Sequence, residues 1–182
     1  MAELRNKSSM QLYFRSFFTK NSFILCAKMT GSLYRKLIVC AGCGIVWYFA
    51  MQVFFVYSGA QKILADPAHQ SSKFLSTFMN EPFPRMAEDR LLVLKGLMIT
   101  GFLMSPALIF INGALRGHWL KKGLLMGLIS WTLVIPWFEF YLPYNVMREP
   151  ITLVVFECLL WLGVMLTIGF YVSLTLNFKT EK

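Results

Sequence analysis

Acidic residues and histidines are scarce in this chain, and the scarcity narrows the chemistry it can perform. It has 9 Asp and Glu residues against 18 Lys and Arg residues, and its 2 histidines are His69 and His118. A bis-histidine haem site or a histidine-rich zinc site needs several histidines on facing elements. A carboxylate-bridged di-iron bundle needs repeated Glu-x-x-His, which this sequence does not contain. We therefore predict no metal or haem cofactor.

Sequence motifs for nucleotide-driven and hydrolytic chemistry are also missing. There is no Gly-x-Ser-x-Gly, no Walker loop and no dinucleotide fingerprint. Cys40 and Cys43 form a Cys-Ala-Gly-Cys spacing inside an apolar run. A redox pair needs water and a relay partner, whereas cysteine also packs as a small apolar residue. The sequence favours packing for this pair, and it favours a non-enzymatic protein without excluding an enzyme.

Long apolar runs are what the chain does have. Hydrophobic residues make up 57% of it and charged residues 15%, where a soluble domain carries about 25% charged residues. Runs of about 20 apolar residues are long enough to cross the hydrocarbon core as helices, and they lack the alternation of barrel strands. The sequence predicts an all-α integral membrane protein, a four-transmembrane-helix bundle within residues 37–178. The four predicted spans are about 37–60, 91–112, 123–142 and 151–176.

Lysine and arginine placement predicts the orientation. Basic residues dominate the N-terminal segment, the loop after the second span and the C-terminal tail, whereas the other two loops mix both signs. This alternation predicts that both termini are cytoplasmic. The net charge of +9 is then mainly a topology signal. It also predicts attraction of anionic lipid to the cytoplasmic face, at about 1 kcal/mol per basic residue, and it does not indicate nucleic acid.

Residues 1–36 form a basic segment with apolar residues at helical spacing. This pattern is typical of an amphipathic helix lying in the cytoplasmic interface. A disordered basic tail is the alternative. A third possibility is that translation starts at Met10 or Met29 rather than at Met1.

Two glutamates, Glu139 and Glu157, lie inside the third and fourth predicted spans. A carboxylate at membrane depth is costly, so it indicates a functional site or a structural lock. They lie roughly 6 and 10 Å inside the ends set by Pro143 and Pro150, and the short turn makes the two spans antiparallel neighbours. Lys95 falls at a similar depth in the second span. We therefore predict an intramembrane polar cluster in which Lys95 pairs with one of the glutamates; an unpaired carboxyl there would be neutral.

The third span carries a second kind of surface. Gly123, Gly127 and Ser130 form a small-xxx-small face that predicts close helix packing. Pro136 predicts a kink before Glu139, which lies about 120° around the helix from the glycine face. Glu139 is therefore expected to face another helix or a cavity. The outer turn adds candidates for the mouth of any pocket: Tyr144, Asn145, Arg148 and Glu149.

Three functional classes follow, in this order. The first is a non-enzymatic scaffold, assembly factor or accessory subunit, acting with a membrane-protein partner or as a homo-oligomer. The second is a small-molecule or proton-coupled carrier that uses Glu139 and Glu157. The third is a membrane enzyme acting on lipid or quinone. The Gly-Leu-Leu-Met-Gly sequence and acidic positions between Lys122 and Trp161 resemble small four-span bacterial membrane proteins. That resemblance implies the inner (plasma) membrane.

Overall fold

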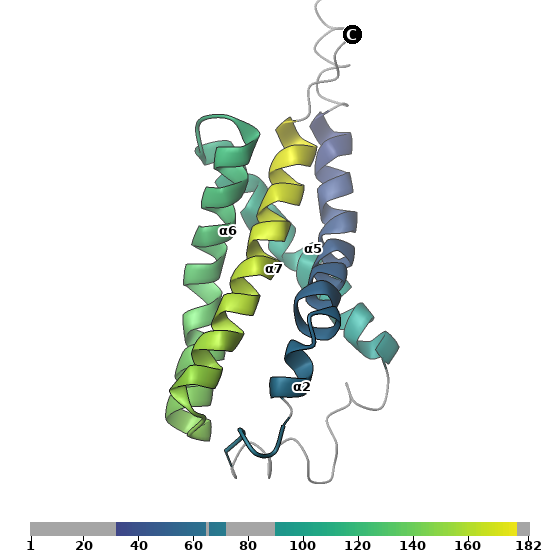
Figure 1. The fold of residues 1–182 in the computed structure, drawn as a ribbon. Coiled ribbons are helices and arrows are strands. Elements are labelled where there is room, and N and C mark those ends of the chain that lie inside the picture. Colours follow the sequence, from purple (N-terminus) through teal and green to yellow (C-terminus); the bar gives the residue numbers. More distant parts are fainter. Residues whose placement is uncertain (1–31, 65, 72–89, 178–182) are drawn as a thin grey trace, which may run out of the picture. The chain divides into compact units, whose positions relative to one another are not determined.

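A computed structural model describes residues 32–64, 66–71 and 90–177 of the chain (Figure 1). These residues include four helices long and apolar enough to cross a membrane: Ser32–Tyr57, Leu91–Ala114, Trp119–Met147 and Ile151–Asn177. No strand occurs in the described ranges, so the predicted all-helical fold with four membrane-length helices is confirmed. The predictions made for residues 1–31, including the interfacial helix and the translation start, lie outside the described residues.

The helices are made of shorter elements. The first span ends in a π-helical segment, η1 (Gln52–Tyr57), and the short helix α2 (Ala60–Leu64) follows it. The second span is α5 (Arg90–Ala114), the third joins α6 (Trp119–Ile135) to η2 (Pro136–Met147), and the fourth is α7 (Ile151–Asn177). The chain divides into two compact units, Met1–Leu37 and Ile38–Lys182. The packing described below is that of the second unit.

The third helix is longer at both ends than the predicted 123–142. It begins at Trp119, because His118 caps it: His118 Nδ1 accepts a hydrogen bond from the Leu120 amide at 3.4 Å. Lys121 and Lys122 therefore lie within the helix, although their charge ended the apolar pattern in the sequence. The helix continues to Met147 because the backbone changes to π-helical geometry at Pro136, a residue that cannot donate to the preceding turn.

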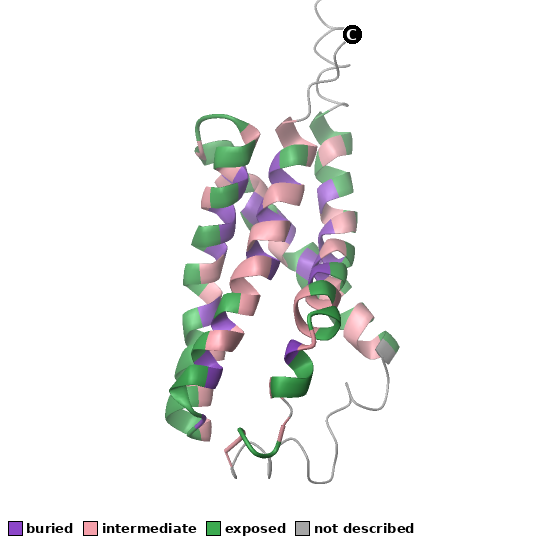
Figure 2. Ribbon diagram, viewed as in Figure 1, coloured by how far each residue is buried: buried purple, intermediate pink, exposed green. Residues whose placement is uncertain are grey.

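α6 and α7 pack at backbone distance through glycines. A Cβ on Gly169 of α7 would lie 2.8 Å from the Gly127 nitrogen and would also meet the Gly123 carbonyl oxygen. Gly123, Gly127 and Ser130 are all buried, whereas the opposite side of α6 is exposed (Figure 2). Small residues permit this approach, and close approach is the main source of helix association in lipid.

The first span packs against both α5 and α7. A Cβ on Gly101 of α5 would meet Gly44 backbone atoms, so these two helices also cross at a glycine pair. The Tyr171 hydroxyl on α7 donates a 2.8 Å hydrogen bond to the Ile38 carbonyl oxygen. Cys43 is buried in the shared core and, like Cys40, is a free thiol.

Candidate functional site

The side chains of Glu139 and Glu157 meet between η2 and α7. Their carboxyl groups are close enough to act on each other electrostatically. Both residues are half-buried. Trp161 follows Glu157 by four residues, so the two share one face of α7, and its ring lies close to both carboxyl groups. The buried Trp161 Nε1–H makes no bond that meets hydrogen-bond geometry.

Two bonds hold the backbone around this carboxyl pair. Trp131 Nε1 on α6 donates to the Cys158 carbonyl oxygen at 2.9 Å. The Cys158 thiol donates a hydrogen bond to the Glu139 carbonyl oxygen at a distance of 3.6 Å. Cys158 directly follows Glu157 on α7, so these contacts fix α7 against both parts of the third span next to the glutamates. The glycine face of α6 and the segment around Glu139 therefore both pack against the same helix, α7.

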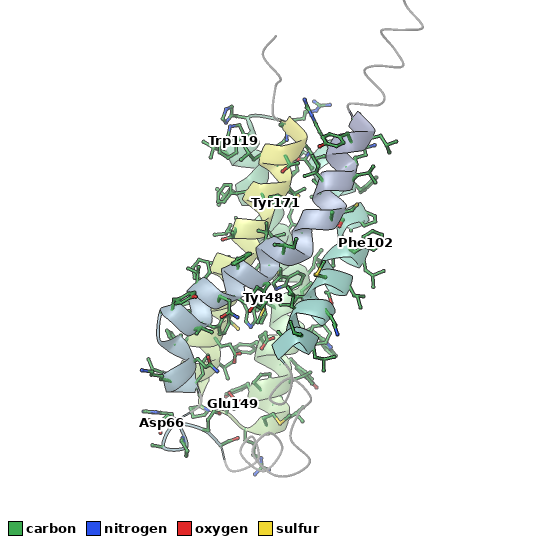
Figure 3. The ribbon with its side chains drawn as sticks, turned by 90° about the vertical axis from the view of Figure 1, so that its right-hand side faces the viewer. Tyr48, Asp66, Phe102, Trp119, Glu149 and Tyr171 are labelled. Carbon is green, nitrogen blue, oxygen red and sulfur yellow. The ribbon has the colours of Figure 1, made fainter. Side chains whose placement is uncertain are left out.

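A third carboxyl group, that of Glu149, lies in the turn between η2 and α7 (Figure 3). Glu149 is only 4% exposed, and its amide donates a 3.1 Å hydrogen bond to the Pro143 carbonyl oxygen. The preceding Arg148 has left-handed backbone angles (φ 60°, ψ 36°), which turn the chain. Glu149 is near enough to act electrostatically on Glu139 and Glu157. Burial raises the pKa of the Glu149 carboxyl.

The other three residues proposed for a pocket mouth are exposed. Tyr144 lies beside Phe140, with ring centroids 5.7 Å apart. The Asn145 side chain donates to the Tyr141 carbonyl oxygen at 3.2 Å. Arg148 is exposed while its neighbour Glu149 is buried. The turn itself is contacted from the first loop, since Ser71 Oγ donates to the Met147 carbonyl oxygen at 2.7 Å.

Lys95 is not brought to the carboxyl pair. It is exposed on α5, and it is not among the groups that act on Glu139 or Glu157. Elsewhere in the described residues, Asp66 lies 3.3 Å from His69 in the loop after α2. The predicted depth of Lys95 in its span was suitable, but depth does not determine which side of a helix a residue occupies.

A second polar cluster at the opposite end was not predicted. Asn177 at the end of α7 donates through Nδ2 to Asn112 Oδ1 at 3.2 Å and to the Ser173 carbonyl oxygen at 2.7 Å. Lys122 Nζ donates to the Asn112 carbonyl oxygen and to Asn177 Oδ1, both at 3.3 Å. Ser173 Oγ donates to the Trp119 carbonyl oxygen at 2.8 Å. The available signal was one amide near the end of each of two apolar runs.

Within the described residues, no group of three or more His, Cys, Asp or Glu side chains could hold a metal ion. No protein-family model, curated protein or solved structure matches the chain. The class of the protein therefore rests on its own fold: it is a small polytopic membrane protein with four candidate spans.

Proposed function

We propose that the Glu139–Glu157 pair is a proton-binding site, and that the protein couples this proton to the binding or transport of a small molecule. One observation carries the proposal: two half-buried carboxyl groups on adjacent membrane-length helices lie close enough to act on each other. Ionised carboxylates only accept hydrogen bonds, so a hydrogen bond between the two groups needs one protonated partner. The pair thus binds one proton between two oxygens.

The surroundings support a shared proton rather than an ion pair. Among the described residues, no lysine or arginine acts on either carboxyl group, and the third charged neighbour is Glu149. Two negative charges in one partly dry site repel each other, so a proton relieves both the repulsion and the cost of burial. These surroundings support a shared proton over a structural Lys95–glutamate lock.

The membrane arrangement is part of the proposal. In this proposal both termini are cytoplasmic, as the distribution of lysine and arginine predicts, and the carboxyl pair then lies in the outer half of an inner (plasma) membrane. Carriers built on alternating access use two repeats that move against each other. One four-helix chain is small for this, so the proposed carrier acts as a homodimer.

Carbodiimide labelling tests the site, because dicyclohexylcarbodiimide modifies protonated carboxyl groups in apolar surroundings. We expect labelling at Glu139 or Glu157 in native membranes, decreasing as the pH rises. Glu139→Gln and Glu157→Gln should each reduce the labelled fraction. Asp66→Asn is the matched control, since Asp66 lies in a loop and pairs with His69, and it should leave labelling unchanged. Labelling that is absent at both glutamates, or independent of pH, would contradict the proposal.

A scaffold or accessory subunit is the second candidate. The observation that favours it is the large exposed apolar surface of all four spans, which either lipid or a partner helix can cover. Extraction in mild detergent followed by native mass measurement separates the two functions. A complex with another protein that survives the Glu139→Gln, Glu157→Gln double substitution supports the scaffold. A dimer of this chain with pH-dependent labelling supports the carrier.

A further inference from the structure

The loop between α5 and α6 gathers basic side chains that no acidic residue accompanies. Arg116 and His118 lie in the loop, and Lys121 and Lys122 lie in the first turn of α6, which contains no acidic residue. The acidic residues that the structure describes belong instead to the loop after α2, to η2, to the turn after it and to the start of α7: Asp66, Glu139, Glu149 and Glu157. Cations at a helix N-terminus oppose the helix dipole, so this positive charge is uncompensated within the described chain.

Lys122 is held in place rather than extended freely into solvent. Its ammonium group donates to the Asn112 carbonyl oxygen and to Asn177 Oδ1, both at 3.3 Å. Asn112 is 6% exposed, and Asn177 Nδ2 donates to its Oδ1 at 3.2 Å. Both acceptors of the ammonium are neutral, so its charge is positioned but not neutralised, and an ammonium has three donors.

The loop geometry keeps the Lys121 side chain close to the backbone next to Arg116. Gly117 has φ +115°, which residues with a side chain rarely adopt. A Cβ built on Gly117 would lie 3.4 Å from Lys121 Cδ, so the Lys121 side chain lies over the loop backbone. Trp119 lies at this end of the bundle (Figure 3), and tryptophan favours the membrane–water interface. Leu120 and Leu124, one turn apart on α6, are 50% and 44% exposed.

We propose that Arg116, Lys121 and Lys122 bind the phosphate group of an anionic phospholipid, whose acyl chain lies along Leu120 and Leu124. Charge complementarity favours this occupant, because the three cations meet no acidic partner among the described residues. Position supports it as well, since the cluster lies where membrane-length helices begin and end. Arginine binds phosphate through two parallel hydrogen bonds and lysine through its point charge. The site is independent of the proposed proton site.

Thermal unfolding of the purified protein in detergent tests the lipid site. A ligand that binds only the folded state raises the unfolding temperature, and the rise grows with the ratio of ligand concentration to Kd. Phosphatidylglycerol should stabilise the protein, and phosphatidylcholine at the same concentration should stabilise it less. The Arg116→Gln, Lys121→Gln double substitution changes exposed residues and leaves the Asn112–Lys122–Asn177 bonds intact. We expect it to abolish the difference between the two lipids and to weaken phosphatidylglycerol binding tenfold or more.

The matched control is Lys62→Gln, Lys95→Gln, which removes two exposed lysines outside the cluster and should keep the preference. Equal stabilisation by the two lipids in the unmodified protein would overturn the proposal. Equal loss of the preference in the control would also overturn it, because net charge rather than a site would then be responsible. Inorganic phosphate is the third probe: stabilisation as large as that by phosphatidylglycerol would assign the cluster to free phosphate and reject the lipid.

Discussion

Gly169 on α7 gives the sharpest test of the packing that holds α6 and α7 together. In Gly169→Ala the new methyl group would lie 2.8 Å from the Gly127 nitrogen and 3.1 Å from the Gly127 Cα, besides meeting the Gly123 carbonyl oxygen. All three are backbone atoms, so no flexible side chain can move aside. The two helices must separate, or the local backbone must shift.

The expected change in the free energy of unfolding of Gly169→Ala is the difference between two effects. Overpacking a close contact costs about 1–3 kcal/mol, and the rigid backbone neighbours of Gly169 put this case in the upper half of that range. Alanine has better helix propensity than glycine by about 1 kcal/mol. The expected net loss of unfolding free energy is therefore about 1–2 kcal/mol.

Gly96 and Gly113 on α5 supply matched controls, because a Cβ on either would meet nothing within 4 Å. Gly96→Ala and Gly113→Ala should be neutral or more stable by up to about 1 kcal/mol. The assay is unfolding in mixed dodecylmaltoside and dodecylsulfate micelles, followed by circular dichroism. If Gly169→Ala is as stable as Gly96→Ala, the backbone contact between α6 and α7 is not present.

Three further substitutions test other contacts. Asn177→Ala leaves buried Asn112 without its side-chain partner and should cost about 1–3 kcal/mol of unfolding free energy, whereas no loss would place the amides in water. Trp131→Phe removes the bond to the Cys158 carbonyl oxygen, and micelle unfolding should show a loss of about 0.5–1.5 kcal/mol. Burial raises the pKa of the Glu149 carboxyl above its ordinary value of 4.5. The contribution of protonated Glu149 to stability is therefore fully present below pH 4.5, and it is lost as the pH rises through the folded-state pKa. Glu149→Gln should therefore flatten the dependence of stability on pH, and parallel profiles for the two proteins would contradict a buried Glu149.

The spans were predictable because their signal is local. A run of about 20 apolar residues has few alternatives to a membrane helix, and the four helices follow from it. The boundaries were less predictable, since capping by His118 and the continuation through Pro143 depend on backbone geometry that composition does not report. Lys121 and Lys122 ended the predicted span although both lie within α6.

For the candidate site, too, the sequence predicted some features and missed others. A short turn between antiparallel helices is enough to predict that Glu139 and Glu157 lie near each other. Which face of η2 carries Glu139 depends on the π-helical segment that begins at Pro136, and the sequence predicted only a kink there. The Lys95 pairing was inferred from depth alone, and α5 leaves that lysine exposed.

The measurement that tests the central claim most directly is infrared spectroscopy of the protonated-carboxyl stretch during a pH titration in lipid. A shared proton predicts a protonated-carboxyl band that persists after Asp66 and other exposed carboxyl groups have ionised. In a Glu149→Gln background, which lacks the third buried carboxyl, Glu139→Gln and Glu157→Gln should each remove that band, because the amide replaces the protonated carboxyl as hydrogen-bond donor to the remaining carboxylate. Asp66→Asn should leave it unchanged. Absence of the band in the Glu149→Gln background, or its persistence there with either Glu139→Gln or Glu157→Gln added, would contradict the proposed proton site.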